Sequence, residues 1–141
     1  NGATNSAKID FGIYRTMYKD AQGVTQYAVN LYNTTAPATV FPIYDTSTWQ
    51  KRATKFSAPI TNQGTVFLTG AISGSTIETL AKARTINLNN TVATTAAAGL
   101  ASGSAVFFLT PEGKYGMMLI NQVTTDLQKR PYIDVSIKMQ N

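Results

Sequence analysis

Residues 104–123 constrain the fold of this chain more than any other part of its sequence. Two apolar runs, SAVFFLT and YGMMLINQV, flank the tight turn Pro111–Lys114. In both runs apolar residues occupy successive positions, so their side chains point to both faces of a strand. A strand that is apolar on both faces is covered above and below. The sequence therefore predicts an antiparallel hairpin at the centre of a packed sheet.

The last segment, PYIDVSIKMQ, alternates between apolar and polar residues. Alternation of this kind predicts a strand with one face on the core and one face in water. Four side chains are predicted to point inward: Ile133, Val135, Ile137 and Met139. Four are predicted to point outward: Tyr132, Asp134, Ser136 and Lys138. This strand would close a three-stranded meander.

The N-terminal segment predicts a second antiparallel pair. KIDFGIYRTMY places Ile9, Phe11, Ile13 and Met17 on one alternating face, and KDAQG supplies a turn. VTQYAVNLYN then returns with Tyr27, Val29 and Leu31 on one side. A two-stranded ribbon is the expected structure.

Three prolines (Pro37, Pro42 and Pro59) loosen the pattern between residues 34 and 59, because proline cannot donate to a strand ladder. ATVFPIYD is predicted as an edge strand. Trp49 and Phe56 are predicted to plug the core, with an exposed ligand platform as the alternative.

The stretch after the prolines is predicted to pass from strand to helix. GTVFLTGAI has the composition of a short strand, and Ser75 and Glu78 have the spacing of a helix-capping box. Ile77, Leu80 and Ala81 then form a helical stripe. For NNTVATTAAAGLASG, a second helix beginning near Asn90 and Thr-rich turns both stay open.

Composition excludes several kinds of chemistry. Without cysteine or histidine, the chain has no disulfide, thiolate or imidazole metal site, cysteine nucleophile or histidine base. The twelve Lys and Arg residues are scattered, so the net charge of +5 predicts a solvated basic face and no nucleic-acid partner. No apolar run approaches the ~18 residues that a membrane-spanning helix requires. We expect no metal and no cofactor.

Neither the carboxylates nor the glycines form a recognisable catalytic motif. The seven Asp and Glu residues are dispersed, so a glycosidase pair would have to assemble in space. We therefore expect no catalytic residue.

Aromatic residues give the strongest indication of a ligand, since exposed rings with nearby polar groups suit sugars. The candidate ligand-binding residues are Trp49, Tyr44, Tyr14, Tyr32 and Arg52. The alternative is that tyrosines simply populate strands, where their propensity is high.

Several motifs resemble a family of uncharacterised, often lipid-anchored exported domains of Bacteroidota. They are KIDF, the Trp49-x-x-Arg52-x-Thr54-x-Phe56 pattern, the Gly113–Gly116 hairpin and the Ile-Asp-Val strand that follows. The resemblance covers about half of the chain, and MMLINQV departs from the family pattern. It implies an outer-membrane or cell-surface lipoprotein whose lipid anchor lies outside this sequence. It assigns no catalytic residue.

Together these features predict an α+β fold with a mainly antiparallel sheet of about five to seven strands and one or two short helices. Residues 1–7 are expected to form a flexible tether, and residues 8–141 a single domain. The predicted function is a non-catalytic, cell-surface or periplasmic binding or scaffold domain of a lipoprotein, accessory to an outer-membrane complex. Its partner would be a cell-surface protein or a polysaccharide. The alternatives are a carbohydrate-binding module and a small glycan hydrolase.

Overall fold

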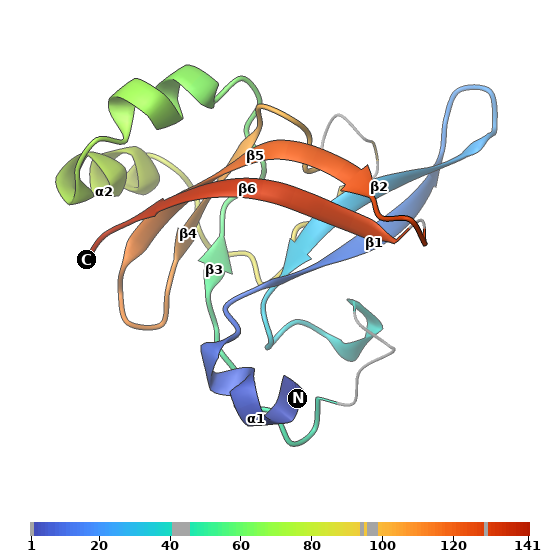
Figure 1. Ribbon diagram of the computed structural model, residues 1–141, viewed down its shortest axis with the longest axis horizontal. Helices are drawn as coiled ribbons and strands as arrows, with labels where there is room; N and C mark the ends of the chain where they lie inside the picture. Colours follow the sequence, from blue (N-terminus) through green and yellow to red (C-terminus); the bar gives the residue numbers. More distant parts are fainter. Residues whose placement is uncertain (1, 41–45, 94, 96–98, 129) are drawn as a thin grey trace.

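The predicted α+β fold is confirmed: six mostly antiparallel strands form two sheets, accompanied by short helices (Figure 1). The computed structural model describes residues 2–40, 46–93, 95, 99–128 and 130–141. One sheet is a ribbon of β1 (Gly12–Lys19) and β2 (Thr25–Tyr32). The other has the order β3-β4-β5-β6, with bounds Lys55–Phe56, Ala105–Leu109, Tyr115–Thr125 and Pro131–Met139. The division into two sheets is not visible in the sequence.

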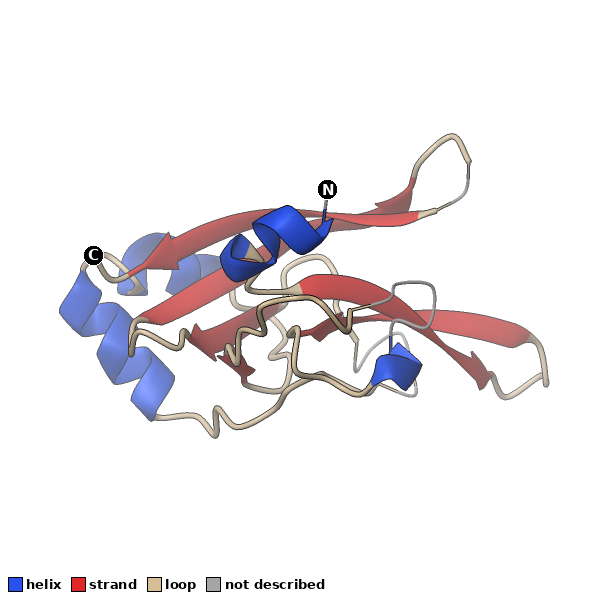
Figure 2. Ribbon diagram, turned by 90° about the horizontal axis from the view of Figure 1, so that it is seen from below, coloured by secondary structure: helices blue, strands red, loops and turns tan. Residues whose placement is uncertain are grey.

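The β4–β5 hairpin is covered on both faces, as its sequence predicts. Alternate side chains enter two separate cores, and the strands lie in two layers with α2 (Gly74–Lys82) at the end near the C terminus (Figure 2). The ribbon-side core comprises Val29, Leu31, Phe56, Leu100, Val106, Phe108, Met118 and Ile120. The helix-side core comprises Phe67, Ala71, Ile77, Ala81, Ala105, Phe107 and Met117. The Phe108 ring lies so close to Gly116 that a Cβ there would be 2.1 Å from it.

The β1–β2 ribbon forms as predicted, but only half of its apolar face is buried. Ile13 and Leu31 are partners in the register and both contribute to the ribbon-side core. Met17 pairs with Tyr27, and Met17 is 73% exposed. The distal half of the ribbon projects beyond the other sheet, as Figure 1 shows, and the strands of that sheet do not cover it. Met17 therefore shares the alternating face of Ile13 but lies outside the core.

The C-terminal strand β6 follows the predicted alternation only in its first half. Ile133 and Val135 pack against the ribbon-side core, whereas Ile137 and Met139 remain 46% and 49% exposed. On the other face, Lys138 is half-buried rather than outward, and its Nζ donates to the carbonyl oxygen of Phe67 at 2.6 Å. The second half of β6 extends past the ribbon and toward the helical end of the molecule. For this reason Ile137 and Met139 are exposed, and Lys138 packs against the helical segment.

A β-bulge aligns β5 with β6. Ile120 pairs with Val135 and Gln122 pairs with Asp134, so Asn121 is one extra residue in β5. The extra residue allows Val123 to face the same core as Ile120, although an odd number of positions separates them.

Two predictions about the middle of the chain are wrong. The segment predicted as the strand GTVFLTGAI instead contains a π-helical turn, Val66–Gly70, because Phe67 and Ala71 pack onto the second face of the hairpin. The N-cap of helix α2 is Ser73 rather than Ser75. The Ser73 hydroxyl accepts from the Thr76 N–H, and the Thr76 hydroxyl accepts from the Ser73 N–H at 2.9 Å. A two-residue shift in the helix start explains the error.

Residues 88–91 join the two sheets along one side. Leu88 exchanges backbone hydrogen bonds with Phe56 of β3, and the Thr91 N–H donates to the Leu31 carbonyl of β2 at 2.9 Å. The buried Asn30 side chain accepts from both Thr91 Oγ1 and the Ala93 N–H. These bonds pair backbone groups on the outer edges of β2 and β3. Residues 88–91 therefore cover the strand edges on that side of the two-layer structure.

The predicted edge strand at residues 38–45 begins as a 3-10 turn, Ala38–Val40, and residues 41–45 with Pro42 lie outside the described part. The described residues between 90 and 103 contain no helix, so of the two readings left open there, helix and Thr-rich turns, the helix is not found.

The N-terminal residues form two helical turns, α1 (Gly2–Asn5) and Ser6–Lys8. Ser6 is buried, and its hydroxyl accepts from the Gln50 N–H at 2.9 Å. Among the described residues, no helix combines the length and the apolar character that crossing a bilayer requires.

Candidate binding surface

Two of the five candidate ligand-binding residues contact each other on the ribbon. Tyr14 and Tyr32 pack edge to face, with ring centroids 6.2 Å apart. Tyr32 is only 9% exposed, and its ring covers Gly12, where a Cβ would be 2.4 Å away. The Tyr14 hydroxyl donates to the Thr91 carbonyl and accepts from Asn90, while burial raises the pKa of the phenol. These contacts give both rings a packing role.

The remaining aromatic candidates lie elsewhere. Trp49 is half-buried in the loop after residue 45, and its N–H donates to the Thr46 carbonyl. Tyr44 lies outside the described residues. Phe56, which the sequence predicts to be a core plug beside Trp49, is fully buried.

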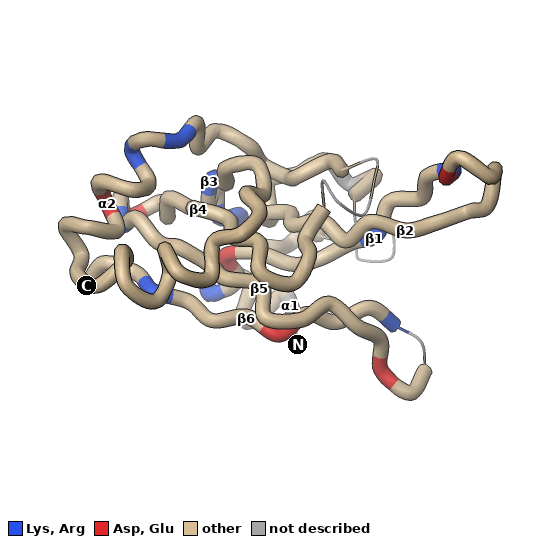
Figure 3. Tube along the Cα trace, turned by 90° about the horizontal axis from the view of Figure 1, so that it is seen from above, with Lys and Arg blue, Asp and Glu red and all other residues tan. Residues whose placement is uncertain are grey.

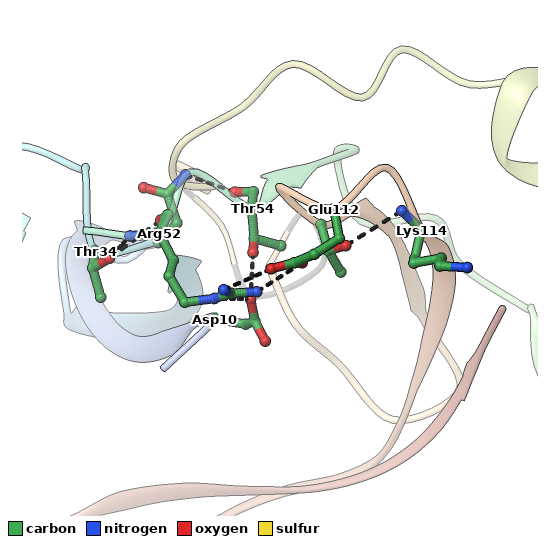
Figure 4. A network of polar contacts seen from close by, with 8 residues as sticks. Asp10, Thr34, Arg52, Thr54, Glu112 and Lys114 are labelled. Carbon is green, nitrogen blue, oxygen red and sulfur yellow. Dashed lines mark hydrogen bonds and ion pairs between the residues drawn. The ribbon is translucent and has the colours of Figure 1, made fainter. Parts of the chain in front are cut away.

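Arg52 lies at the centre of an ion network that joins distant segments (Figure 4). Its Nε donates to Asp10 at 2.8 Å, and its two terminal nitrogens donate to the two carboxylate oxygens of Glu112 at 2.8 and 2.9 Å. The Thr54 hydroxyl also donates to Asp10 at 2.8 Å. The Thr34 hydroxyl bonds both the N–H and the carbonyl of Arg52. Arg52 is therefore engaged within the protein.

The ion network shifts the pKa values of Glu112 and Arg52 in opposite directions. The Arg52 guanidinium lowers the pKa of Glu112 to about 2. In return, Glu112 and then Asp10 raise the pKa of Arg52 further above its ordinary value. Two carboxylates thus converge here, as a glycosidase pair would, but a bidentate arginine lies between them.

Other described carboxylates also accept hydrogen bonds that lower their pKa values. The Gln26 side chain has this effect on Asp20, Lys82 on Glu78, and the Arg130 backbone N–H on Asp126. Asp45 lies outside the described residues. Within the described part of the chain, no group of three acidic side chains is placed to hold a metal ion. Lys and Arg positions are spread from one end of the molecule to the other (Figure 3).

The outer edge of β6 is a feature that the sequence does not reveal. β6 is the last strand of its sheet, and none of the described residues outside β5 pairs with its backbone. Its exposed large side chains are Tyr132, Ile137 and Met139. The other strand without a second neighbour in the described structure is β1, which lies against β6 on the same side. One side of the molecule is therefore open, opposite the side closed by residues 88–91.

A groove of about 470 Å³ follows the second half of this edge. Its walls are residues 71–74 and Ile77 on one side and residues 137–139 on the other, with Asn141 at the end. Three consecutive residues of a strand point alternately to opposite faces, so a groove that touches all three runs along the strand's edge. We call this feature the β6 groove. The alternation of apolar and polar residues predicts which face of the sheet a side chain occupies. It does not predict how far along the strand that face is covered by a second layer, so the sequence does not reveal this groove.

Comparison of the chain with protein-family models, curated sequences and solved structures finds no match.

Proposed function

We propose that the protein is a non-catalytic binding domain that presents the open edge of β6 to a protein partner. An unpaired strand edge offers a row of backbone donors and acceptors, and partner strands bind to such edges by extending the sheet. The observation that carries this proposal is that β6 is a terminal strand with Tyr132, Ile137 and Met139 exposed.

The state of the carboxylates supports a non-catalytic role. A general acid requires a pKa raised toward the working pH. Asp20, Glu78, Glu112 and Asp126 instead have lowered pKa values, because each accepts hydrogen bonds in the folded chain. The cell-surface setting and the association with an outer-membrane complex rest on the family resemblance alone.

Site-specific photo-crosslinking in the cells that make the protein tests this proposal. A photoreactive amino acid at Ile137 should give an adduct of defined mass with a protein partner, because the side chain lies on the open edge. The matched control is Val24, which is 55% exposed at the distal turn of the ribbon. Absence of an adduct at Ile137, or the same adducts at Val24, would contradict the proposal.

A glycan array distinguishes the carbohydrate-binding alternative from binding at the β6 edge. Binding of defined glycans that is lost in Trp49→Ala and retained in the Ile137 variants would favour that alternative and count against the β6 edge. We expect no glycan-dependent signal, because Tyr14 and Tyr32 are engaged with each other and with the chain around Thr91.

A further inference from the structure

We propose that the partner at the β6 edge is a second copy of this chain, bound by antiparallel pairing of the two β6 strands about Ser136. This inference rests on the proposed function, because it identifies what the open edge binds. It follows from the shape of the β6 groove, from its charge and from the sequence of β6 itself.

The groove selects a strand with apolar side chains on one face. Ile137 pairs with Met118 and Met139 pairs with Gly116, so both lie on the ribbon-side face of the sheet. A strand added beside β6 places its side chains on the same two faces as those of its neighbour. It therefore gains most from burial if apolar residues stand opposite Ile137 and Met139.

On the other face, the groove selects an acidic side chain. Lys138 lies on the helix side, where its ammonium is 4.6 Å from the centroid of the Phe67 ring and donates to the Phe67 carbonyl. A lysine ammonium has three donors, and the ion pairs found among the described residues do not include Lys138. The N-terminus of α2 borders the groove and has no acidic residue in its first turn. Its dipole adds to the positive potential.

The required pattern is thus apolar, acidic, apolar, and β6 contains it. Ile133, Asp134 and Val135 are consecutive in the same strand. When two β6 strands run antiparallel with Ser136 opposite Ser136, Lys138 of each copy faces Asp134 of the other. In the same register, Ile137 faces Val135 and Met139 faces Ile133. Two-fold symmetry makes the contact self-complementary and forms each charge pair twice.

This pairing also explains why a lysine is compatible with the edge. An inward-pointing lysine on an edge strand ordinarily discourages pairing with another chain. Here Asp134, four residues earlier on the same face, supplies the opposite charge from the second copy. Its Oδ1 accepts from the Asn121 side chain at 3.2 Å, and a carboxylate accepts several hydrogen bonds.

Sedimentation equilibrium of the purified protein, from roughly 1 µM to 1 mM, tests the inference. The wild-type chain should show a reversible monomer–dimer equilibrium. Lys138→Asp and Asp134→Lys should each raise the dissociation constant at least about tenfold, since like charges then meet at two places. The combined Asp134→Lys/Lys138→Asp variant should return to within about threefold of wild type, because the pairs are restored with reversed sign.

Control variants test whether a change in the dissociation constant arises at the β6 edge. Lys19→Asp makes the same charge change at the distal end of the ribbon, where Lys19 bonds Thr25, and should leave the equilibrium unchanged. Thermal unfolding of each variant checks that it folds, and Asp134→Lys leaves the Lys138–Phe67 contact intact if Lys138→Asp does not fold. In the dimer, amide hydrogen exchange should slow in β6 and not in β1.

Each alternative result counts against the inference. A monomer at every concentration overturns it, while an Ile137 adduct with a different protein would still support the proposed function. A dimer that the single reversals do not weaken, or that the double reversal does not restore, overturns this pairing.

Discussion

At the scale of single residues, Arg52 connects three segments that are distant in sequence. Asp10 precedes β1, Arg52 lies in the loop before β3, and Glu112 lies in the β4–β5 turn. The Arg52 side chain is 20% exposed, whereas that of Glu112 is 55% exposed. A network of this kind fastens the N-terminal segment to the central hairpin, and its strength depends on the ionisation of the acids.

The ion network predicts a defined response to acid. The pKa of Glu112 falls from an ordinary value of 4.5 to about 2 in the folded chain, because Arg52 stabilises the carboxylate. A lowered folded-state pKa contributes stability above the unfolded-state pKa, and this contribution is lost as the pH falls from about 4.5 to 2. We expect Glu112→Gln to reduce the fall in the thermal unfolding midpoint over that range.

The Arg52→Gln background is the control for this experiment. Without the guanidinium, the pKa of Glu112 loses the largest cause of its lowering, and only the hydrogen bonds from its own backbone N–H and from Thr110 still lower it. Glu112→Gln should then have a clearly smaller effect on the pH dependence. An equal effect of Glu112→Gln in both backgrounds would show that Arg52 is not its partner.

The residue types that compose this network were visible in the sequence, but their association was not. The sequence predicts Arg52 as a candidate ligand-binding residue. The structure instead gives its donors to Asp10 and Glu112, which are 42 and 60 positions away. No local pattern encodes pairs at that separation. Tyr14 shows the same limit, since its hydroxyl bonds Thr91 and Asn90, which are 77 and 76 positions away in the sequence. Tyr32 likewise forms a backbone bridge with Asn90.

At the scale of elements, the start of α2 differs from its sequence prediction by two residues. Both Ser73-x-x-Thr76 and Ser75-x-x-Glu78 have the spacing of a capping box, and the structure uses the first. Glu78 instead forms an ion pair with Lys82 and accepts from Gln140 at 3.0 Å.

Substitution of the two serines distinguishes the caps. Ser73→Ala should lower the free energy of unfolding by about 1 kcal/mol, because the Thr76 N–H loses its acceptor. Ser75→Ala is the matched control and should change it by less than about 0.5 kcal/mol. Urea denaturation measures both. A larger loss for Ser75→Ala would place the cap at the later serine.

The elements that sequence predicts well are those whose pattern does not depend on distant contacts. The β4–β5 hairpin combines a proline–glycine turn with strands apolar on both faces, and both signals are local. The strand predicted at GTVFLTGAI fails because Phe67 and Ala71 gain more by packing on the hairpin as a helical turn. The sequence does not identify the β6 edge, because Ile137 and Met139 continue the alternation that predicts inward side chains. In the structure they lie beyond the layer that covers Ile133 and Val135 and are exposed.

At the scale of the whole molecule, two cores share one hairpin. Leu31 packs onto its ribbon-side face and Ile77 onto its helix-side face, and both side chains are buried. The ribbon also packs on its outer face, where Tyr14 and Tyr32 form a small apolar cluster with Ala36 and Val40, but the hairpin is the element that both large cores have in common. The two halves should therefore unfold together rather than as separate units.

Core truncations on the two sides test this cooperativity. Leu31→Ala and Ile77→Ala should each lower the free energy of unfolding by about 2–5 kcal/mol through loss of buried contacts. Calorimetry should show a single transition in both variants, shifted to lower temperature. Leu127→Ala, at a residue that is 98% exposed, should leave the midpoint nearly unchanged. Two resolved transitions in either variant would mean that the layers fold independently.

The additional residue at Asn121 determines which face of the sheet each later side chain of β5 occupies. Removing it would reverse the orientation of every later side chain in β5, turning Val123 away from Ile133 and placing a polar neighbour against the core. Length changes in the loops would spare this alignment. A one-residue deletion inside β5 would disrupt this alignment. The number of residues between Ile120 and Val123 is therefore a strict requirement of the fold.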